Sequence, residues 1–175
     1  MSTVRERLDA VAAGFEGVRA VDDLRGDPAF VADRASAKAF LTRLRDDEGL
    51  RFTFLSFVTA VDNYLDEPRF EVTYRLRSLE HNQDLRVNVP TGGEEPEVDT
   101  VTDLFPGANW MEREVWDMFG IRFAGHPNLT RILMWEGFEG FPLRKDYPLL
   151  GNTPGTPGYV GKGGKPAARP GEDAS

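Results

Sequence analysis

The chain of 175 residues contains no cysteine. Without thiolates it forms no disulfide bond, no thiolate zinc site and no iron–sulfur cluster of the usual cysteine-ligated kind. Histidine, the commonest general base in enzymes, occurs only at His81 and His126. If the chain serves a redox assembly, we therefore expect the electrons to travel through neighbouring polypeptides.

A long apolar run and an excess of positive charge are also missing. The longest apolar stretch, residues 52–61, is about half of what a membrane-spanning helix needs. The amino-terminal residues lack the apolar core of a signal peptide. The formal net charge of −8 disfavours binding to nucleic acid or to anionic lipid. We expect no nucleic-acid partner, no direct membrane span and a cytoplasmic location.

The hydrophobic pattern of residues 1–120 predicts a globular α+β domain. Apolar side chains recur at helical spacing in three segments, residues 2–14, 33–47 and 109–119. Thr3 and Glu6 have the spacing of a capping box at the start of the first helix. The second helix ends in Asp46-Asp47-Glu48, which oppose the helix dipole, and the sequence offers no reason for them.

Three strands are predicted between the second and third helices, at residues 52–62, 69–79 and 85–89. The second alternates apolar and polar side chains, and the connections are short, which favours an antiparallel meander. The first is apolar on both faces, as is typical of a central strand. We expect a small sheet containing this meander, packed by two to three helices.

Periodicity fades after residue 120. Residues 121–150 are predicted to be an extended partner-docking segment, which we expect to form a C-terminal arm. Residues 151–175 are a Gly/Pro-rich tail that cannot build a core. Nine of the chain's 19 aromatic residues, including all three tryptophans, fall within residues 105–148. Such a segment either packs on its own domain or supplies anchors for a protein interface, and its extended form favours the interface.

The candidate interface residues are charged or aromatic members of this block: Glu112, Arg113, Glu114, Trp116, Asp117, His126, Arg131, Arg144, Lys145 and Asp146. A metal site is the alternative for some of them. Only Glu114 and Asp117 converge by helical spacing, whereas a site needs at least three ligands. We expect no metal, catalytic or cofactor-binding residue here, and a structural role for His126.

Three ordered blocks in the same region resemble a known signature. They are EREVWDMFG at 112–120, HPNLTRIL at 126–133 and FEGFPLRKDYPL at 138–149. Together they resemble the 30-kDa subunit family of complex I, whose bacterial members are the C subunits of NADH-quinone oxidoreductase. Two positions depart from the family pattern: Thr130 replaces a usual basic residue, and Phe141 stands where His or Tyr is common.

The resemblance implies a small α/β domain with a mixed sheet. It implies a non-catalytic structural subunit in the peripheral arm of proton-pumping NADH:quinone oxidoreductase, a respiratory translocase. The partners would be the 49-kDa quinone-site subunit and other peripheral-arm subunits, at the cytoplasmic face of the bacterial plasma membrane. FMN, iron–sulfur clusters and quinone would belong to partner subunits, with no cofactor in this chain.

Two alternatives remain open from the sequence. One is the equivalent subunit of a membrane-bound hydrogenase or of another donor-linked relative of complex I. The other is a stand-alone acid–base or metal enzyme.

Overall fold

The computed structural model describes residues 3–22, 26–135 and 137–148. It contains α1 (Val4–Ala12), β1 (Val18–Val21), β2 (Ala29–Ala32), α2 (Arg34–Asp46), β3 (Phe54–Asp62), β4 (Phe70–Ser78), β5 (Gln83–Thr91), β6 (Glu97–Asp99), α3 (Ala108–Phe119) and β7 (Arg122–Ala124). The predicted α+β class is confirmed. None of the helices in these ranges is long and apolar enough to cross a membrane.

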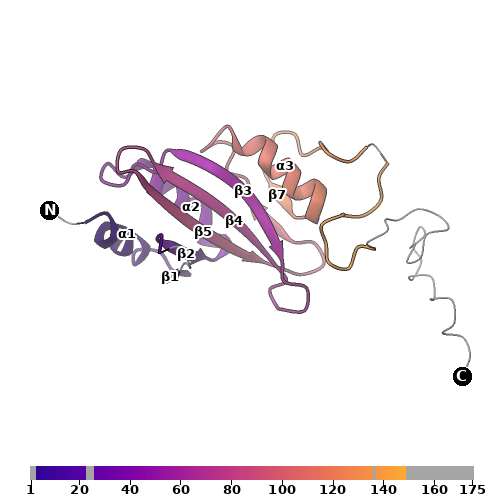
Figure 1. Ribbon diagram of the computed structural model, residues 1–175, viewed down its shortest axis with the longest axis horizontal. Helices are drawn as coiled ribbons and strands as arrows, with labels where there is room; N and C mark the ends of the chain where they lie inside the picture. Colours follow the sequence, from indigo (N-terminus) through magenta and orange to yellow (C-terminus); the bar gives the residue numbers. More distant parts are fainter. Residues whose placement is uncertain (1–2, 23–25, 136, 149–175) are drawn as a thin grey trace, which may run out of the picture.

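A five-stranded mixed sheet forms the centre of the fold, in the order β1-β2-β5-β4-β3. The antiparallel meander β3-β4-β5 is confirmed, and β2 pairs with β5 in parallel. Figure 1 shows α2 behind the sheet and α3 beside β3. The pairing register places Phe30, Val87, Tyr74 and Val58 in one row across the sheet, and all four are buried. This inner face is the core on which α2 packs, with Phe40 edge-to-face against Phe30.

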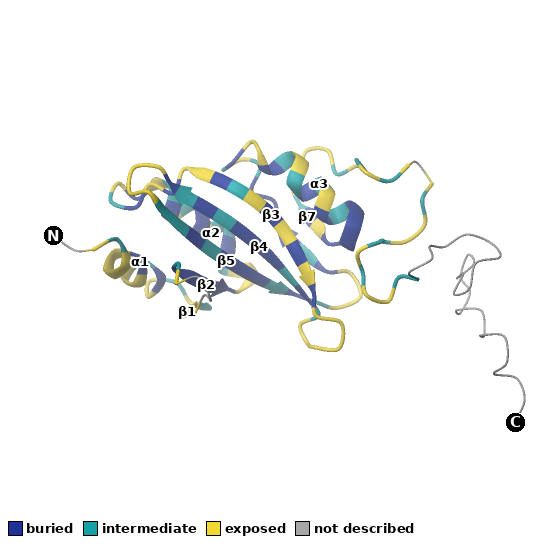
Figure 2. Cartoon of the chain, viewed as in Figure 1, coloured by how far each residue is buried: buried dark blue, intermediate teal, exposed yellow. Residues whose placement is uncertain are grey.

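Two features of the sheet differ from the prediction. Strand β2 was not expected, because its four residues AFVA are all buried and so show no alternation. The prediction that β3 is a central strand is wrong: β3 lies at the edge of the sheet. Its second apolar row, Phe54, Phe57 and Val61, is exposed on the surface (Figure 2). Apolar side chains on both faces of this strand therefore did not indicate that both faces are buried.

The open edge of β3 is partly closed by α3. The backbone N–H of Val58, in the middle of the strand, donates to Met111 Sδ on α3 at 3.2 Å. An edge strand normally leaves its amides unpaired, which invites pairing with another chain. The contact fixes α3 next to β3 and so positions the motif block that α3 carries.

The helix ends of α1 and α2 explain two sequence features. Thr3 and Glu6 form the predicted capping box at the start of α1. The unexplained acidic end of α2 contains Asp47, whose buried carboxylate accepts hydrogen bonds from Arg7 and from the backbone of Gly49, and pairs with Arg43. Asp47 therefore joins α1 to α2, which offsets its unfavourable position at a helix C-terminus.

The packed domain continues past residue 120. Strand β7 pairs in parallel with β6, and Ile121 and Phe123 belong to the core. Beyond it, residues 125–148 contain no helix or strand at the positions that the structure describes. We call residues 125–148 the C-terminal arm. The predicted tail, 151–175, lies outside the described residues.

Candidate functional site

The first anchor of the C-terminal arm is Asp117, near the end of α3. Its side chain is fully buried. One carboxylate oxygen, Oδ2, accepts hydrogen bonds from the consecutive backbone amides of Ile132, Leu133 and Met134 at 3.0, 2.8 and 2.9 Å. The other, Oδ1, accepts from Arg131 Nη1 at 2.6 Å. Burial alone would raise the pKa of Asp117, but the three amides and the guanidinium together hold the pKa below its ordinary value.

Arg131 connects this anchor to the rest of the arm. Its Nη2 donates to the carbonyl oxygen of Gly140 at 3.1 Å. Its guanidinium carbon lies 5.7, 5.6 and 5.5 Å from the ring centres of Trp116, Phe138 and Phe141. The aromatic residues of the arm therefore gather around one cation whose charge is already paired.

A second anchor holds the end of the arm against the meander. Asp62, the last residue of β3, is buried and accepts two hydrogen bonds from Arg69 at 2.8 Å each. It also accepts the backbone N–H of Lys145 at 2.8 Å. Arg69 reaches on to Asp146 at 2.8 and 3.1 Å. The Arg69 hydrogen bonds, opposed by burial, lower the pKa of the Asp62 carboxyl well below its ordinary value.

Arg144 fixes the arm to the C-terminal end of α3. Its Nε donates to the carbonyl oxygen of Phe119 at 2.5 Å, and its guanidinium carbon lies 5.1 Å from the Phe70 ring centre and 4.6 Å from that of Phe141. Gly120 ends α3 with a φ of 73°, and a Cβ there would lie 2.5 Å from a Phe141 ring carbon. Only glycine satisfies both the turn and this close approach.

Glu112, on the buried side of α3, binds within the domain. Its Oε1 accepts the backbone N–H of Val101 at 2.8 Å, and its Oε2 accepts the Thr100 hydroxyl at 2.5 Å. Burial raises the pKa of Glu112 to about 7, although both hydrogen bonds oppose the rise. The carboxyl group is therefore poised between its neutral and charged forms near neutral pH.

His126 holds the start of the arm over the first turn of α3. Its Nδ1 accepts the backbone N–H of Asn128 at 3.0 Å, so the ring proton lies on Nε2. That N–H faces the carbonyl oxygen of Asn109 at 3.2 Å, and Nε2 is 4.0 Å from Glu112 Oε2. In this geometry the His126 ring joins the start of the arm to the first turn of α3.

The remaining predicted residues divide into paired and exposed groups. Arg113 donates to the carbonyl oxygens of Thr130 and Arg131 at 3.0 and 3.2 Å, and so binds the arm. The side chains of Glu114 and Lys145 are exposed, and no hydrogen bond or ion pair joins them to another described residue. Glu114 and Asp117 do not converge as their spacing suggested, because Asp117 turns into the fold. The described ranges contain no cluster of three or more metal-ligating side chains.

The structure also exposes apolar residues that the candidate set left out. Trp110 and Trp135 are 64% and 68% exposed, and Leu133 and Leu143 are more than half exposed. A cavity of about 450 Å³ opens between α3 and the arm, lined by Trp116, Leu129, Thr130, Arg131, Met134 and Gly137. In the sequence most of these residues stand between the charged residues of the motif blocks, and this apolar spacing could have indicated them as interface candidates.

The comparisons with known proteins bear out the resemblance. Residues 30–153 match the family described as "Respiratory-chain NADH dehydrogenase, 30 Kd subunit". The second of the NADH-quinone oxidoreductase C subunits of Rhizobium meliloti (strain 1021) is 48% identical over 147 residues, which cover 82% of this chain and 79% of that protein. The corresponding C subunit of Sinorhizobium medicae (strain WSM419) is 47% identical over 150 residues, covering 86% of this chain and 71% of that protein.

Two solved structures have the same fold. The trypsin-resistant fragment (1–134) of Nqo5 superposes with a TM-score of 0.62 at 33% identity, covering 73% of this chain and 100% of the fragment. A chain of the membrane-bound sulfane sulfur reductase, an archaeal respiratory membrane complex, gives a TM-score of 0.71 at 23% identity, covering 83% and 86%. The second likeness concerns the fold alone.

Fold, motif blocks and relatives define a component of a respiratory oxidoreductase. The chain belongs to the family of the respiratory-chain NADH dehydrogenase 30-kDa subunit. It is a subunit of a complex I-type assembly and has partner subunits there.

Glu112→Gln should remove a pH dependence of stability. A carboxyl group whose pKa rises on folding favours the folded state below its unfolded pKa, and this stability is lost as the pH rises through the folded pKa. The rise from 4.5 to about 7 corresponds to about 3 kcal/mol. The free energy of unfolding is measured with denaturant at pH 4.5 and at pH 8. From the lower to the higher pH, it should fall by this amount more in the wild type than in the variant. The exposed control Glu114→Gln should keep the pH dependence of the wild type. If Glu112→Gln also kept it, the raised pKa would not belong to Glu112.

Asp117→Asn should release the arm while the domain stays folded. The substitution removes a charge that accepts three backbone hydrogen bonds, at a cost of about 2 kcal/mol, so cleavage by trypsin after Arg131 should accelerate more than tenfold. A time course by mass spectrometry measures this, with cleavage after Arg75 in the sheet as the internal reference. Glu114→Gln, an exposed change on the same helix, should cleave at the wild-type rate. Unchanged cleavage in Asp117→Asn would show that the arm does not depend on this carboxylate.

Proposed function

We propose that this chain is a non-catalytic structural subunit in the peripheral arm of a proton-pumping NADH:quinone oxidoreductase. In this role its C-terminal arm docks onto the 49-kDa subunit at the quinone site and supports that subunit while electrons pass from NADH to quinone. The relatives, which are named as C subunits of NADH-quinone oxidoreductase, favour the NADH-linked assembly over a hydrogenase or another donor-linked relative.

One observation carries the docking proposal: most of the charged motif residues bind within the chain, whereas large apolar side chains of the same block are exposed. Asp117, Arg131 and Arg144 have their partners in the fold. Trp135 and Leu133 are exposed on the segment that those residues hold. Tryptophan is one of the residue types enriched among the few side chains that carry most of the binding energy at protein interfaces.

The internal anchors also reduce the entropy lost on docking. A segment without helix or strand would be expensive to order on a partner, because each immobilised side chain costs about 0.5–1.5 kcal/mol. Here Asp117 fixes the backbone of the arm at residues 132–134, and Asp62 fixes it at Lys145. The partner therefore binds a preformed surface, and less of the interaction free energy is offset by the entropy lost in ordering the arm.

The chemistry of the complex would reside in other subunits. FMN, the iron–sulfur clusters and quinone are proposed for the partners. For the clusters the reason is that this chain offers no thiolate ligand. Attachment to the cytoplasmic face of the membrane would likewise be indirect, through the complex.

The test is to replace the exposed side chains without disturbing the anchors. Leu133→Ala combined with Trp135→Ala should lower the amount of 49-kDa subunit recovered with the tagged chain at least tenfold. NADH:quinone turnover per assembled complex should stay unchanged. Leu79→Ala is the matched control, because Leu79 is equally exposed but follows β4, away from the arm. Normal recovery with abolished turnover would contradict the proposal and assign chemistry to this chain.

A further inference from the structure

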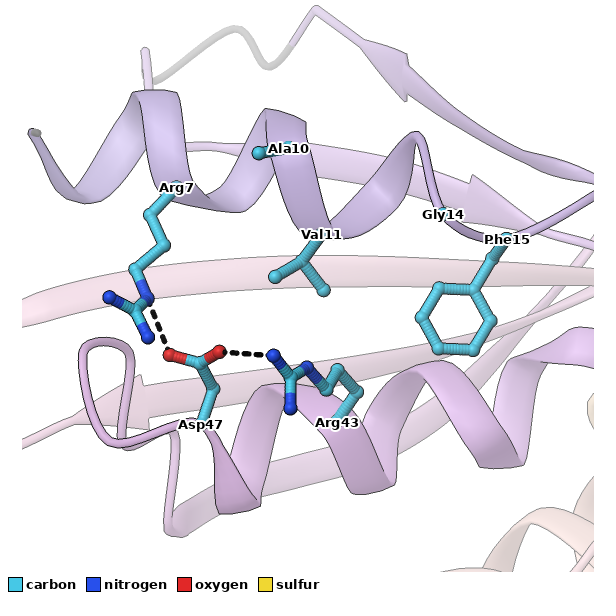
Figure 3. A pocket seen from close by; sticks show the side chains of 7 residues that line it. All are labelled: Arg7, Ala10, Val11, Gly14, Phe15, Arg43 and Asp47. Atoms are coloured by element: carbon cyan, nitrogen blue, oxygen red, sulfur yellow. Dashed lines mark hydrogen bonds and ion pairs between the residues drawn. The ribbon is translucent and has the colours of Figure 1, made fainter.

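A second hollow lies between α1 and α2, with a volume of about 440 Å³. Its wall is apolar and is formed by Ala10, Val11 and Phe15, while Arg7 and Arg43 stand at one end (Figure 3). A volume of this size suits an inserted side chain or a small ligand. The hollow thus has two chemically distinct parts, an apolar wall and a cationic end.

The cationic end carries an unbalanced positive charge. Asp47, with its side chain 1% exposed, accepts from Arg7 Nε at 2.6 Å and pairs with Arg43 Nη2 at 3.0 Å, and Figure 3 shows both guanidinium groups turned toward it. Burial alone would raise the pKa of Asp47, but the hydrogen bonds from Arg7 and from the backbone of Gly49, with the two nearby charges, together lower it, so its carboxyl is ionised at neutral pH. Two cations and one anion leave a net charge of +1.

This arrangement exceeds what a clamp between two helices requires. One arginine is sufficient to neutralise Asp47, yet Arg7 and Arg43 both contact it, and their side chains remain 45% and 56% exposed. No ion pair joins either guanidinium to any other described residue. Each guanidinium has five N–H donors, so donors remain at the rim of the hollow. An excess cation is also conspicuous in a chain of net charge −8.

We propose that this hollow is a second docking site, which receives a carboxylate side chain and an adjacent apolar side chain from a neighbouring subunit of the assembly. A single carboxylate balances the net charge of +1, and its two oxygens match the paired N–H donors of a guanidinium. A phosphate group carries up to two negative charges and would leave an excess beside the buried Asp47. The apolar residue of the partner would cover Val11 and Phe15.

The site is separate from the surface of the proposed function. Figure 1 shows α1 and the described C-terminal segment at opposite ends of the long axis. The family match begins at residue 30, so α1 lies outside it. The chain would therefore contact neighbouring subunits at both ends. The subunit whose carboxylate enters the hollow beside α1 need not be the subunit to which the arm binds.

The experiment places the photo-cross-linking residue p-benzoylphenylalanine at position 10 of the full chain, in the complex purified from membranes through a tag on this chain. Ala10 is exposed and lines the hollow. Mass spectrometry should find a cross-link to a segment of another subunit that contains Asp or Glu next to an apolar residue. No cross-link to another subunit, or a cross-link only to lipid or to a second copy of this chain, would overturn the proposal.

A matched pair of variants tests the charge. Arg43→Met keeps the aliphatic stem and leaves Asp47 paired with Arg7, so the helices should stay packed, as a thermal unfolding midpoint would verify. It should lower the yield of the cross-link from position 10 at least threefold, whereas Arg51→Met, at another exposed arginine, should not. An unchanged yield in Arg43→Met would refute recognition by charge. p-Benzoylphenylalanine placed at position 135 instead reports on docking of the arm. A missing cross-link at the hollow is thereby distinguished from a missing cross-link at the arm, which would count against the proposed function.

Discussion

Three consecutive backbone amides share one carboxylate oxygen of Asp117, and the conformation of the C-terminal arm depends on this contact. An extended segment without a strand partner has no regular way to satisfy its amides, and unsatisfied groups beside a protein surface are costly. A buried carboxylate solves this problem because it accepts several hydrogen bonds at once and strengthens each by its charge. Asp62 does the same for Lys145 at the other end. Two acidic side chains thus accept four backbone amides of a segment that has neither helix nor strand.

Much of the domain could be predicted from sequence because its signals are local. The capping box at Thr3 and the alternation in β4 depend on residues a few positions apart, and both are present. The errors came from non-local facts. Phe54 and Phe57 on the exposed face of β3 form the same apolar pattern as side chains on a buried face. Whether such a face is buried depends on what packs against it, and the local sequence does not show this. Asp47 is unfavourable for its own helix and becomes favourable only through Arg7, 40 residues away.

The candidate site shows the same limit more sharply. The motif blocks identified the family, and their charged residues were predicted to meet a partner. A sequence cannot distinguish an arginine that binds another subunit from one that binds its own chain, because both need the same side chain. The structure gives Asp117, Arg131 and Arg144 internal partners and leaves Trp135 outside. The docking surface we propose is therefore held by the charged positions and made by the apolar residues between them.

Hydrogen exchange of the isolated chain tests most directly whether the arm is held without its partners. The account predicts that the amides of residues 132–134 and of Lys145 exchange at least about a hundredfold more slowly than in an unstructured peptide, because buried carboxylates hold them. Exchange at the rate of an unstructured peptide at these positions, with a protected sheet, would contradict it. The arm would then take its shape only on the partner.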